Sequence, residues 1–144
     1  MTPIGIGELN VTFTKEPSHE ATYDAGLAVR RAVLGSEYVD ASLSNATDFN
    51  SALQDLVTEY CWGAVWTRDG LERRDRSLLN LAMMTALNRP HELALHVRGA
   101  LNNGLSREEI REVFLQTAIY AGIPAAIESF KVAQAVFTEE DARD

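Results

Sequence analysis

The sequence predicts an all-α protein, a bundle of about six helices joined by short connections. Apolar residues recur at intervals of three and four through most of the chain, as they do along one face of a helix. Proline, glycine and capping residues divide the chain into segments of helical length. Hydrophobic residues make up 46% of the 144 residues and charged residues 24%, a balance typical of a folded chain. This length fits one domain with one core.

The N-terminal residues 1–19 are expected to form an arm outside the core, because they hold two of the four prolines and show no helical period. The helical domain is expected to span residues 20–138, and residues 139–144 form an acidic tail. Its first helix is predicted at about residues 21–34. Gly35 follows it as a left-handed C-terminal cap.

A short helical segment is predicted over residues 37–43, and a long helix over about residues 47–64 with Asn45 or Thr47 as its N-cap. The glycines at 63 and 70 and the charged residues between them indicate a loop. Residues 73–88 then form a helix that is apolar nearly all round. We expect it to be the most buried element of the bundle.

The last three helices are expected at residues 90–103, 107–121 and 124–137, each separated from its neighbour by glycine or proline. Ser106 and Glu109 match the capping-box pattern at the start of the second of these. Because this pattern satisfies two backbone N–H groups at once, it gives the clearest boundary in the chain.

Charge and hydropathy exclude some classes of partner. The formal net charge of −8 repels polyanions, and no concentrated basic face is evident, so no nucleic-acid partner is expected. No run of about 20 apolar residues could cross a membrane. The N-terminus also lacks the basic region and apolar stretch of a signal peptide. A cytoplasmic protein without a membrane partner is therefore expected.

Cysteine and histidine are too few for several kinds of site. Cys61 is the only cysteine, so the chain can form no intramolecular disulfide and no zinc site with two of its own thiolates. His91 and His96 are five residues apart, whereas residues on one helical face recur at three or four. No metal site is expected. Cys61 itself is interpreted as a small buried apolar residue rather than a nucleophile.

Glu92 and His96 form the first candidate site, because residues i and i+4 of a helix can touch. A carboxylate beside an imidazole holds its tautomer and raises its pKa, so the pair could donate a proton. The alternative is an exposed pair worth tenths of a kcal/mol.

Arginines and tryptophans form a second candidate cluster. Its members are Trp62, Trp66, Arg68, Arg73, Arg74 and Arg76. Arginine binds carboxylates through two parallel hydrogen bonds, and indole rings exclude water, so the cluster would suit a small di-acid. Alternatively, neighbouring carboxylates balance these arginines on a solvated surface, and the tryptophans belong to the core or to an interface. Tyr120 is expected to be a core aromatic with its hydroxyl satisfied.

Seven segments between residues 23 and 137 resemble the γ-carboxymuconolactone decarboxylases in order and spacing. They read Tyr23-Asp24-Ala25-Gly26, Val29-Arg30-Arg31-Ala32-Val33-Leu34-Gly35, Trp62-Gly63-x-x-Trp66-Thr67-Arg68, Arg76-Ser77-Leu78-Leu79, Asn88-Arg89-x-x-Glu92-Leu93-x-Leu95-His96, Asn102-Asn103-Gly104 and Ala118-Ile119-Tyr120-x-Gly122-Ile123-Pro124-Ala125-Ala126.

This resemblance implies a helical fold shared with the alkylhydroperoxidase D group and a homo-oligomer, a trimer or hexamer, with sites near subunit interfaces. The peroxidase-like members carry two cysteines where Arg89 and Glu92 stand here. Without that dithiol there can be no thiol–disulfide cycle. The sequence departs from the redox branch in the way the decarboxylases do.

The implied reaction is the cofactor-independent loss of CO2 from 4-carboxymuconolactone, giving 4-oxoadipate enol-lactone in protocatechuate breakdown by the β-ketoadipate pathway. The conjugated lactone itself accepts the electrons that CO2 leaves behind. The resemblance implies that His96 and Glu92 polarise the carbonyl and deliver a proton. It implies substrate contacts for Arg73, Arg74, Arg76, Arg89, Trp62, Trp66 and Tyr120.

Three positions depart from the family pattern, Tyr60, Ile127 and Lys131, where relatives tend to have His, Asn and His. A pocket position that has become apolar indicates a different substrate. Two alternatives therefore stay open. One is a family enzyme acting on another lactone or a polyketide-derived acid in biosynthesis, and the other is a non-catalytic oligomeric module.

Overall fold

The computed structural model describes residues 15–144, and every regular element in that range is helical. The all-α prediction is confirmed. Residues 1–14 of the expected arm lie outside the described residues. The elements are α1 (His19–Leu34), α2 (Ser36–Ser44), α3 (Ser51–Leu56), the π-helix η1 (Val57–Val65), α4 (Arg73–Ala86), α5 (Pro90–Asn102), α6 (Arg107–Ala121) and α7 (Ile123–Arg143).

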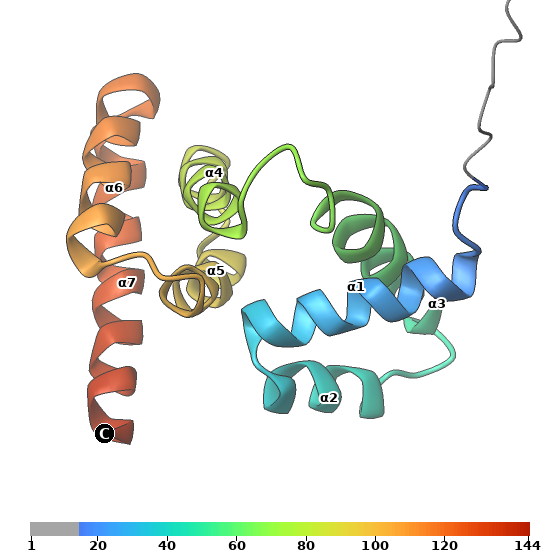
Figure 1. Cartoon of the computed structure of the whole chain (residues 1–144). Helices are drawn as coiled ribbons and strands as arrows, with labels where there is room; N and C mark the ends of the chain where they lie inside the picture. Colours follow the sequence, from blue (N-terminus) through green and yellow to red (C-terminus); the bar gives the residue numbers. More distant parts are fainter. Residues whose placement is uncertain (1–14) are drawn as a thin grey trace, which may run out of the picture.

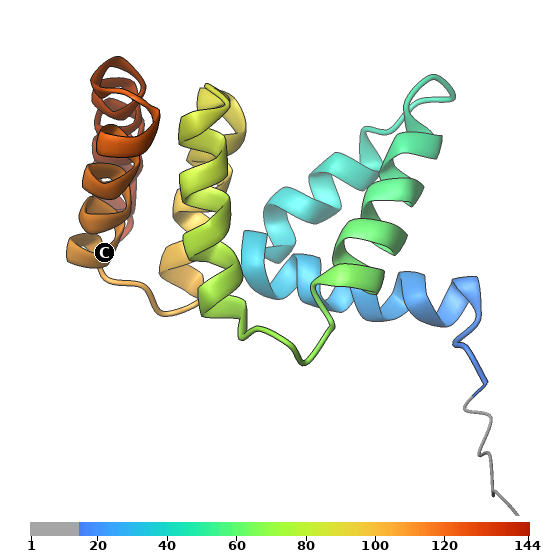
Figure 2. The same ribbon diagram turned by 90° about the horizontal axis from the view of Figure 1, so that it is seen from above.

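The helices are arranged in three groups (Figure 1). Helices α6 and α7 pair at one end, α4 and α5 lie in the middle, and α1, α2, α3 and η1 form the other end. The view from above shows the same order (Figure 2). Helix α5 contacts both α7 and α1, so the middle pair joins the two ends.

Two hydrophobic clusters form the core. The larger is centred on Leu81, Leu93, Val97 and Phe114 and joins α4, α5, α6 and α7. The smaller joins α1 to η1. Helix α4 is not the most buried element, contrary to our expectation, because only Ser77, Leu81 and Thr85 of its side chains are buried. Its outer face finds no cover within residues 15–144 and leaves Leu79 and Met83 about half exposed.

The end of the fold formed by α1, α2, α3 and η1 differs from the predicted helices in detail. Ser18 caps α1 two residues earlier than expected, its hydroxyl accepting from the backbone N–H of Ala21. Gly35 has φ 90° and ψ 138°, which is not the left-handed helical cap expected but a turn directly into α2. The predicted long helix starts at Ser51, and its second half is the π-helix η1.

Gly63 was expected in a loop but lies inside η1, where α1 and η1 pack backbone to backbone. A Cβ added to Gly63 would lie 2.2 Å from the carbonyl oxygen of Thr22, and one added to Gly26 would lie 2.1 Å from the carbonyl oxygen of Thr58. Glycine is therefore required here by close approach, not by a turn.

The end formed by α6 and α7 follows the prediction more closely. The capping box of Ser106 and Glu109 is present, with both reciprocal hydrogen bonds formed. Helix α7 runs to Arg143, beyond the end predicted from its apolar residues. Ion pairs from α7 to Arg98 and Arg107 hold its last turns, which explains why a polar segment stays helical.

Candidate active site

His96 faces α4 from the middle of α5 and is partly buried. Its Nδ1 lies 3.3 Å from the side-chain nitrogen Nδ2 of Asn80 on α4. Burial lowers the pKa of His96, and the Glu92 carboxylate opposes this shift to a smaller extent. Glu92 raises the pKa of His96 as predicted, but the loss of hydration outweighs the carboxylate, so the net shift is downward.

Glu92 itself is exposed in the first turn of α5. A carboxylate in that position is favoured by the positive end of the helix dipole. Within residues 15–144, no hydrogen bond or ion pair joins Glu92 to His96, whose contact is with Asn80. The two predicted catalytic residues thus share a helix face without forming the predicted pair.

Arg76 lies one turn before Asn80 on α4, so the two side chains lie on the same face. Its Nη2 donates to the carbonyl oxygen of Arg68 at 3.1 Å. Its Nε is buried and has no hydrogen-bond partner in the described part of the chain. We refer to Arg76, Asn80 and His96 as the α4–α5 row. It combines a guanidinium with one unpartnered N–H group, an amide and an imidazole.

The other predicted arginines do not join this row. Arg74 is ion-paired with Glu109 of α6. Arg73 is exposed, and the exposed Arg89 donates to the carbonyl oxygen of Leu87 at 3.2 Å. The structure therefore separates arginines that are close in sequence, because successive helical positions point in different directions.

The two tryptophans stack on each other with ring centroids 4.7 Å apart. They are only 3% (Trp62) and 6% (Trp66) exposed and pack against Val29 and Val33 of α1. This agrees with the alternative that assigned them to the core. Trp66 also borders a small cavity that Arg73 lines.

Tyr120 does not belong to the core, contrary to our expectation, because it is 83% exposed. It lies near the end of α6 and lines a mostly apolar depression together with Gln116 and Met83. The helical period placed it on a face that another element would cover, but none does so within residues 15–144.

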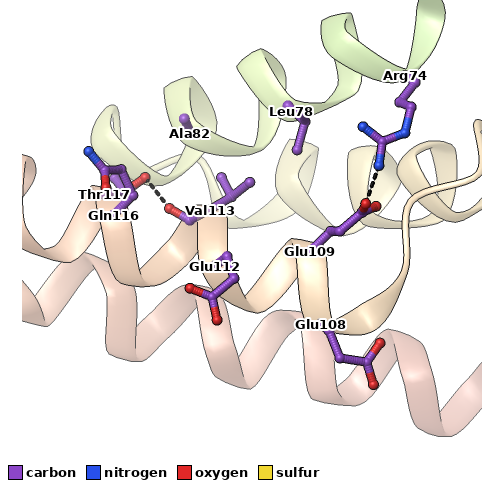
Figure 3. Close-up of a pocket in the computed structure, with 9 residues that line it drawn as sticks. All are labelled: Arg74, Leu78, Ala82, Glu108, Glu109, Glu112, Val113, Gln116 and Thr117. Carbon is purple, nitrogen blue, oxygen red and sulfur yellow. Dashed lines mark hydrogen bonds and ion pairs between the residues drawn. The ribbon is translucent and has the colours of Figure 1, made fainter.

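A groove of about 500 Å³ lies between α4 and α6. Leu78 and Ala82 of α4 face Val113 of α6, and the Arg74–Glu109 pair closes one end (Figure 3). The sequence did not indicate this groove, because its walls come from helices that are far apart in the chain. Three carboxylates border it, those of Glu108, Glu109 and Glu112. Their charge disfavours a dianionic ligand, so the α4–α5 row is the better candidate for binding a di-acid.

Arg30 is a buried charge that sequence reasoning did not single out. It is 5% exposed and donates to the Thr58 hydroxyl and to the side-chain amide oxygen Oε1 of Gln54, both at 3.0 Å. Cys61 keeps exposed surface, which corrects our expectation of a buried residue. Burial nevertheless raises the pKa of its thiol, and Arg30 opposes this only in part. A thiol that stays protonated at neutral pH is a poor nucleophile.

Within residues 15–144, no group of three or more His, Cys, Asp or Glu side chains could hold a metal ion. No helix in the same range is both long and apolar enough to cross a membrane. Two of the three positions that depart from the family pattern, Tyr60 and Ile127, are about half exposed.

The chain matches the model of the carboxymuconolactone decarboxylase family over residues 51–135. It is 48% identical over 121 residues to the nitrosuccinic acid decarboxylase of Metarhizium robertsii, covering 84% of this chain and 85% of that protein. It is 42% identical over 120 residues to the 4-carboxymuconolactone decarboxylase of Acinetobacter baylyi, covering 83% of this chain and 90% of that protein.

Proposed function

Because the chain belongs to the carboxymuconolactone decarboxylase family, we propose that it removes one carboxylate as CO2 from a small dicarboxylic acid. The observation that carries this proposal is the α4–α5 row, where Arg76 has a buried Nε without a partner in the described chain, one turn from the amide that contacts His96. A guanidinium on α4 and an imidazole on α5, linked by the Asn80 amide, suit an acid that must be held by one carboxylate while it loses another.

The acids named for the two relatives share the chemistry this reaction needs. Each has a carboxylate on a carbon whose electrons can pass to an acceptor, a conjugated lactone carbonyl in one and a nitro group in the other. When the carbon–carboxylate bond breaks, its electron pair moves to an oxygen of that acceptor and CO2 leaves. A proton then bonds to carbon and restores the neutral acceptor group. The substrate thus provides its own electron sink, so we propose that no cofactor takes part.

We assign roles to the chain's residues on this basis. Arg76 binds the carboxylate that is retained, since a planar guanidinium can donate two parallel hydrogen bonds. His96 donates a hydrogen bond to the oxygen on which negative charge develops, where a donor held in a fixed position lowers the barrier. Glu92, which is exposed one turn before His96, is assigned the relay of a proton from water to carbon.

The other predicted substrate contacts are not part of this proposal. Arg74 is paired with Glu109, and the two tryptophans are buried in the core. Arg73, Arg89 and Tyr120 are exposed outside the α4–α5 row.

Two acids are the candidates for the substrate. 4-Carboxymuconolactone is the one implied by the sequence motifs, and nitrosuccinic acid is favoured by the higher identity to the decarboxylase named for it, 48% against 42%. We therefore propose that the substrate is an acid whose departing carboxylate lies on a carbon that can pass its electrons to an acceptor. Nitrosuccinic acid is the first such acid to assay.

The predicted homo-oligomer also stays a proposal. Large apolar side chains are exposed on α4 and α6, among them Leu79, Met83 and Ile119. Exposed large apolar side chains often belong to surfaces that another chain covers, which supports an assembly. Light scattering on the purified chain would give its mass, and a monomer at micromolar concentration would refute the proposal.

The test of function is CO2 release from each acid by the purified chain, with ultraviolet absorbance followed in parallel. We expect His96→Ala to lower kcat by about 10²-fold, the typical effect of losing one such donor. Arg76→Lys keeps the charge but loses the two-pronged contact, so KM should rise about tenfold. Arg111→Ala is the matched control, since Arg111 is an exposed arginine of α6.

Two results would count against the proposal. If His96→Ala and Arg76→Lys both kept activity within about threefold of the wild type, under ~0.7 kcal/mol, the α4–α5 row would not be the active site. If the folded wild type released no CO2 from either acid, the decarboxylase assignment would fail for these substrates. A non-catalytic module or another acid would then be favoured, and family membership would stand.

A further inference from the structure

The contact between Asn80 and His96 determines which ring nitrogen carries the proton. The Asn80 atom that faces His96 is the amide nitrogen Nδ2, 3.3 Å from Nδ1 of the ring. With the amide in this orientation its NH2 group can only donate, so Nδ1 accepts through its lone pair and carries no proton. In a neutral imidazole the proton then lies on Nε2.

The same contact disfavours the doubly protonated ring. An imidazolium carries N–H groups at both nitrogens, so an N–H of His96 would point at the NH2 group of Asn80. Burial acts in the same direction, because a charged ring loses hydration that no carboxylate in contact replaces. Glu92 is the charged group that opposes this effect, and it does so more weakly than burial.

The other ring nitrogen remains available. In the described part of the chain, the buried side-chain nitrogens and oxygens that lack a partner are the Nε atoms of Arg30 and Arg76. Nε2 of His96 is not among them and forms no hydrogen bond within residues 15–144, so it keeps access to solvent. One nitrogen of the ring is thus occupied and the other open.

We infer that Asn80 is a positioning residue that holds His96 as a neutral imidazole with its proton on Nε2. The open side of the ring then presents a hydrogen-bond donor and not a base. The assignment of the tautomer depends only on the contact between α4 and α5. Its consequence for catalysis rests on the proposed function, in which His96 donates to the oxygen that gains negative charge.

Asn80 was not among the residues selected from the sequence, although a signal for it exists. It lies four residues after Arg76, which places it on the same face of α4. The sequence does not show that His96 is its partner, because Asn80 and His96 are sixteen residues apart on two different helices.

The test is the proton position on the histidine rings of the full chain, read from long-range ¹H–¹⁵N correlations of ¹⁵N-labelled protein at pH 7.5. His96 should show an unprotonated Nδ1 and a protonated Nε2. His19 provides the opposite reference in the same spectrum, because its Nδ1 contacts the Glu59 carboxylate, which can only accept.

Asn80→Asp is the decisive variant. Its carboxylate must accept from the ring, so the proton should move to Nδ1 and Nε2 should become the acceptor. Asn50→Asp adds the same charge elsewhere and keeps its own role, since Oδ1 of Asn50 accepts from the backbone N–H of Thr47 and a carboxylate oxygen can do the same. It should leave the His96 spectrum unchanged. If Asn80→Asp fails to fold by circular dichroism, Asn80→Ala replaces it, and a mixture of both tautomers is then expected.

The spectra and the activity answer separate questions. A protonated Nδ1 in the wild type, or an unchanged His96 tautomer in the folded Asn80 variant, would overturn the inference. With the expected tautomers, kcat for the accepted acid should fall about 10²-fold or more in Asn80→Asp, while Asn50→Asp keeps wild-type kcat. Unchanged kcat in Asn80→Asp would overturn the positioning role in catalysis. A wild type with the expected tautomer but no activity on either acid would refute the proposed function and leave the tautomer assignment standing.

Discussion

Replacing Gly26 with alanine should destabilise the protein, although alanine is the better helix former. Gly26 lies on α1 where it crosses η1, the most extensive contact between two helices in the described chain. A Cβ at this position would lie 2.1 Å from the carbonyl oxygen of Thr58, 2.5 Å from the backbone nitrogen of Gly63 and 2.8 Å from its Cα. All three atoms belong to backbone, so no side chain can rotate away.

The size of the effect follows from these distances. Ordinary contact begins at 3.4 Å, so the two helices would have to separate by roughly 1 Å, a gap that forfeits about a quarter to a half of each dispersion contact across it. The contacts of Trp62 and Trp66 with Val29 and Val33 lie at this interface. Overpacking of this kind costs about 1–3 kcal/mol or more, while the propensity gain from glycine to alanine is about 1 kcal/mol. Because all three clashes are with backbone, we take the upper end of this cost, about 3 kcal/mol, which leaves a net loss of about 2 kcal/mol.

The assay is urea unfolding followed by circular dichroism, with thermal melts at the same protein concentration. The expected loss corresponds to a Tm lower by about 6 °C for a chain of this length. Gly70→Ala is the matched control, because a Cβ there meets nothing within 4 Å and Gly70 lies in the loop between η1 and α4. Equal stability of the Gly26 and Gly70 variants would refute the close approach of α1 and η1.

Three further predictions concern stability. The partly buried ring of His96 has a pKa below the ordinary value of 6.5, so just below pH 6.5 the unfolded chain binds a proton more readily than the folded chain. The free energy of unfolding should therefore be highest above pH 6.5 and decrease as the pH drops below it. Urea titrations of His96→Gln should show a weaker decrease. Thr85 and Ser129 are buried and joined by a hydrogen bond of 2.8 Å. Ser129→Ala should cost about 1–3 kcal/mol of stability by leaving the Thr85 hydroxyl unpaired. In a double-mutant cycle, adding Thr85→Val should recover part of this loss, whereas strictly additive losses would contradict the contact. Ser106→Ala should cost about 1 kcal/mol in the same assay by removing the cap of α6, and a neutral result would mean that the capping box adds no stability.

Most helices could be predicted because their signals are local. A capping serine, a proline in the first turn and a glycine after the last turn act on backbone groups within four residues of themselves. Ser106, Pro90 and Gly122 mark observed helix ends for this reason. The π-helix η1 could not be predicted in the same way, because apolar spacing over residues 57–65 also suits an α-helix. Its close packing on α1 depends on two glycines that lie far apart in the chain.

The candidate site also has features that the sequence determined and others that depended on tertiary packing. By itself, the sequence determined the helical class, the family motifs and the presence of Glu92, His96 and several arginines, because these depend on composition and on order along the chain. Only the tertiary structure decided which side chains meet. It paired His96 with Asn80 instead of Glu92, put Trp62 and Trp66 in the core, and left Tyr120 exposed. It also decided the direction of the His96 pKa shift, because desolvation depends on what packs around a side chain, and the helices that pack around His96 are brought there by the fold.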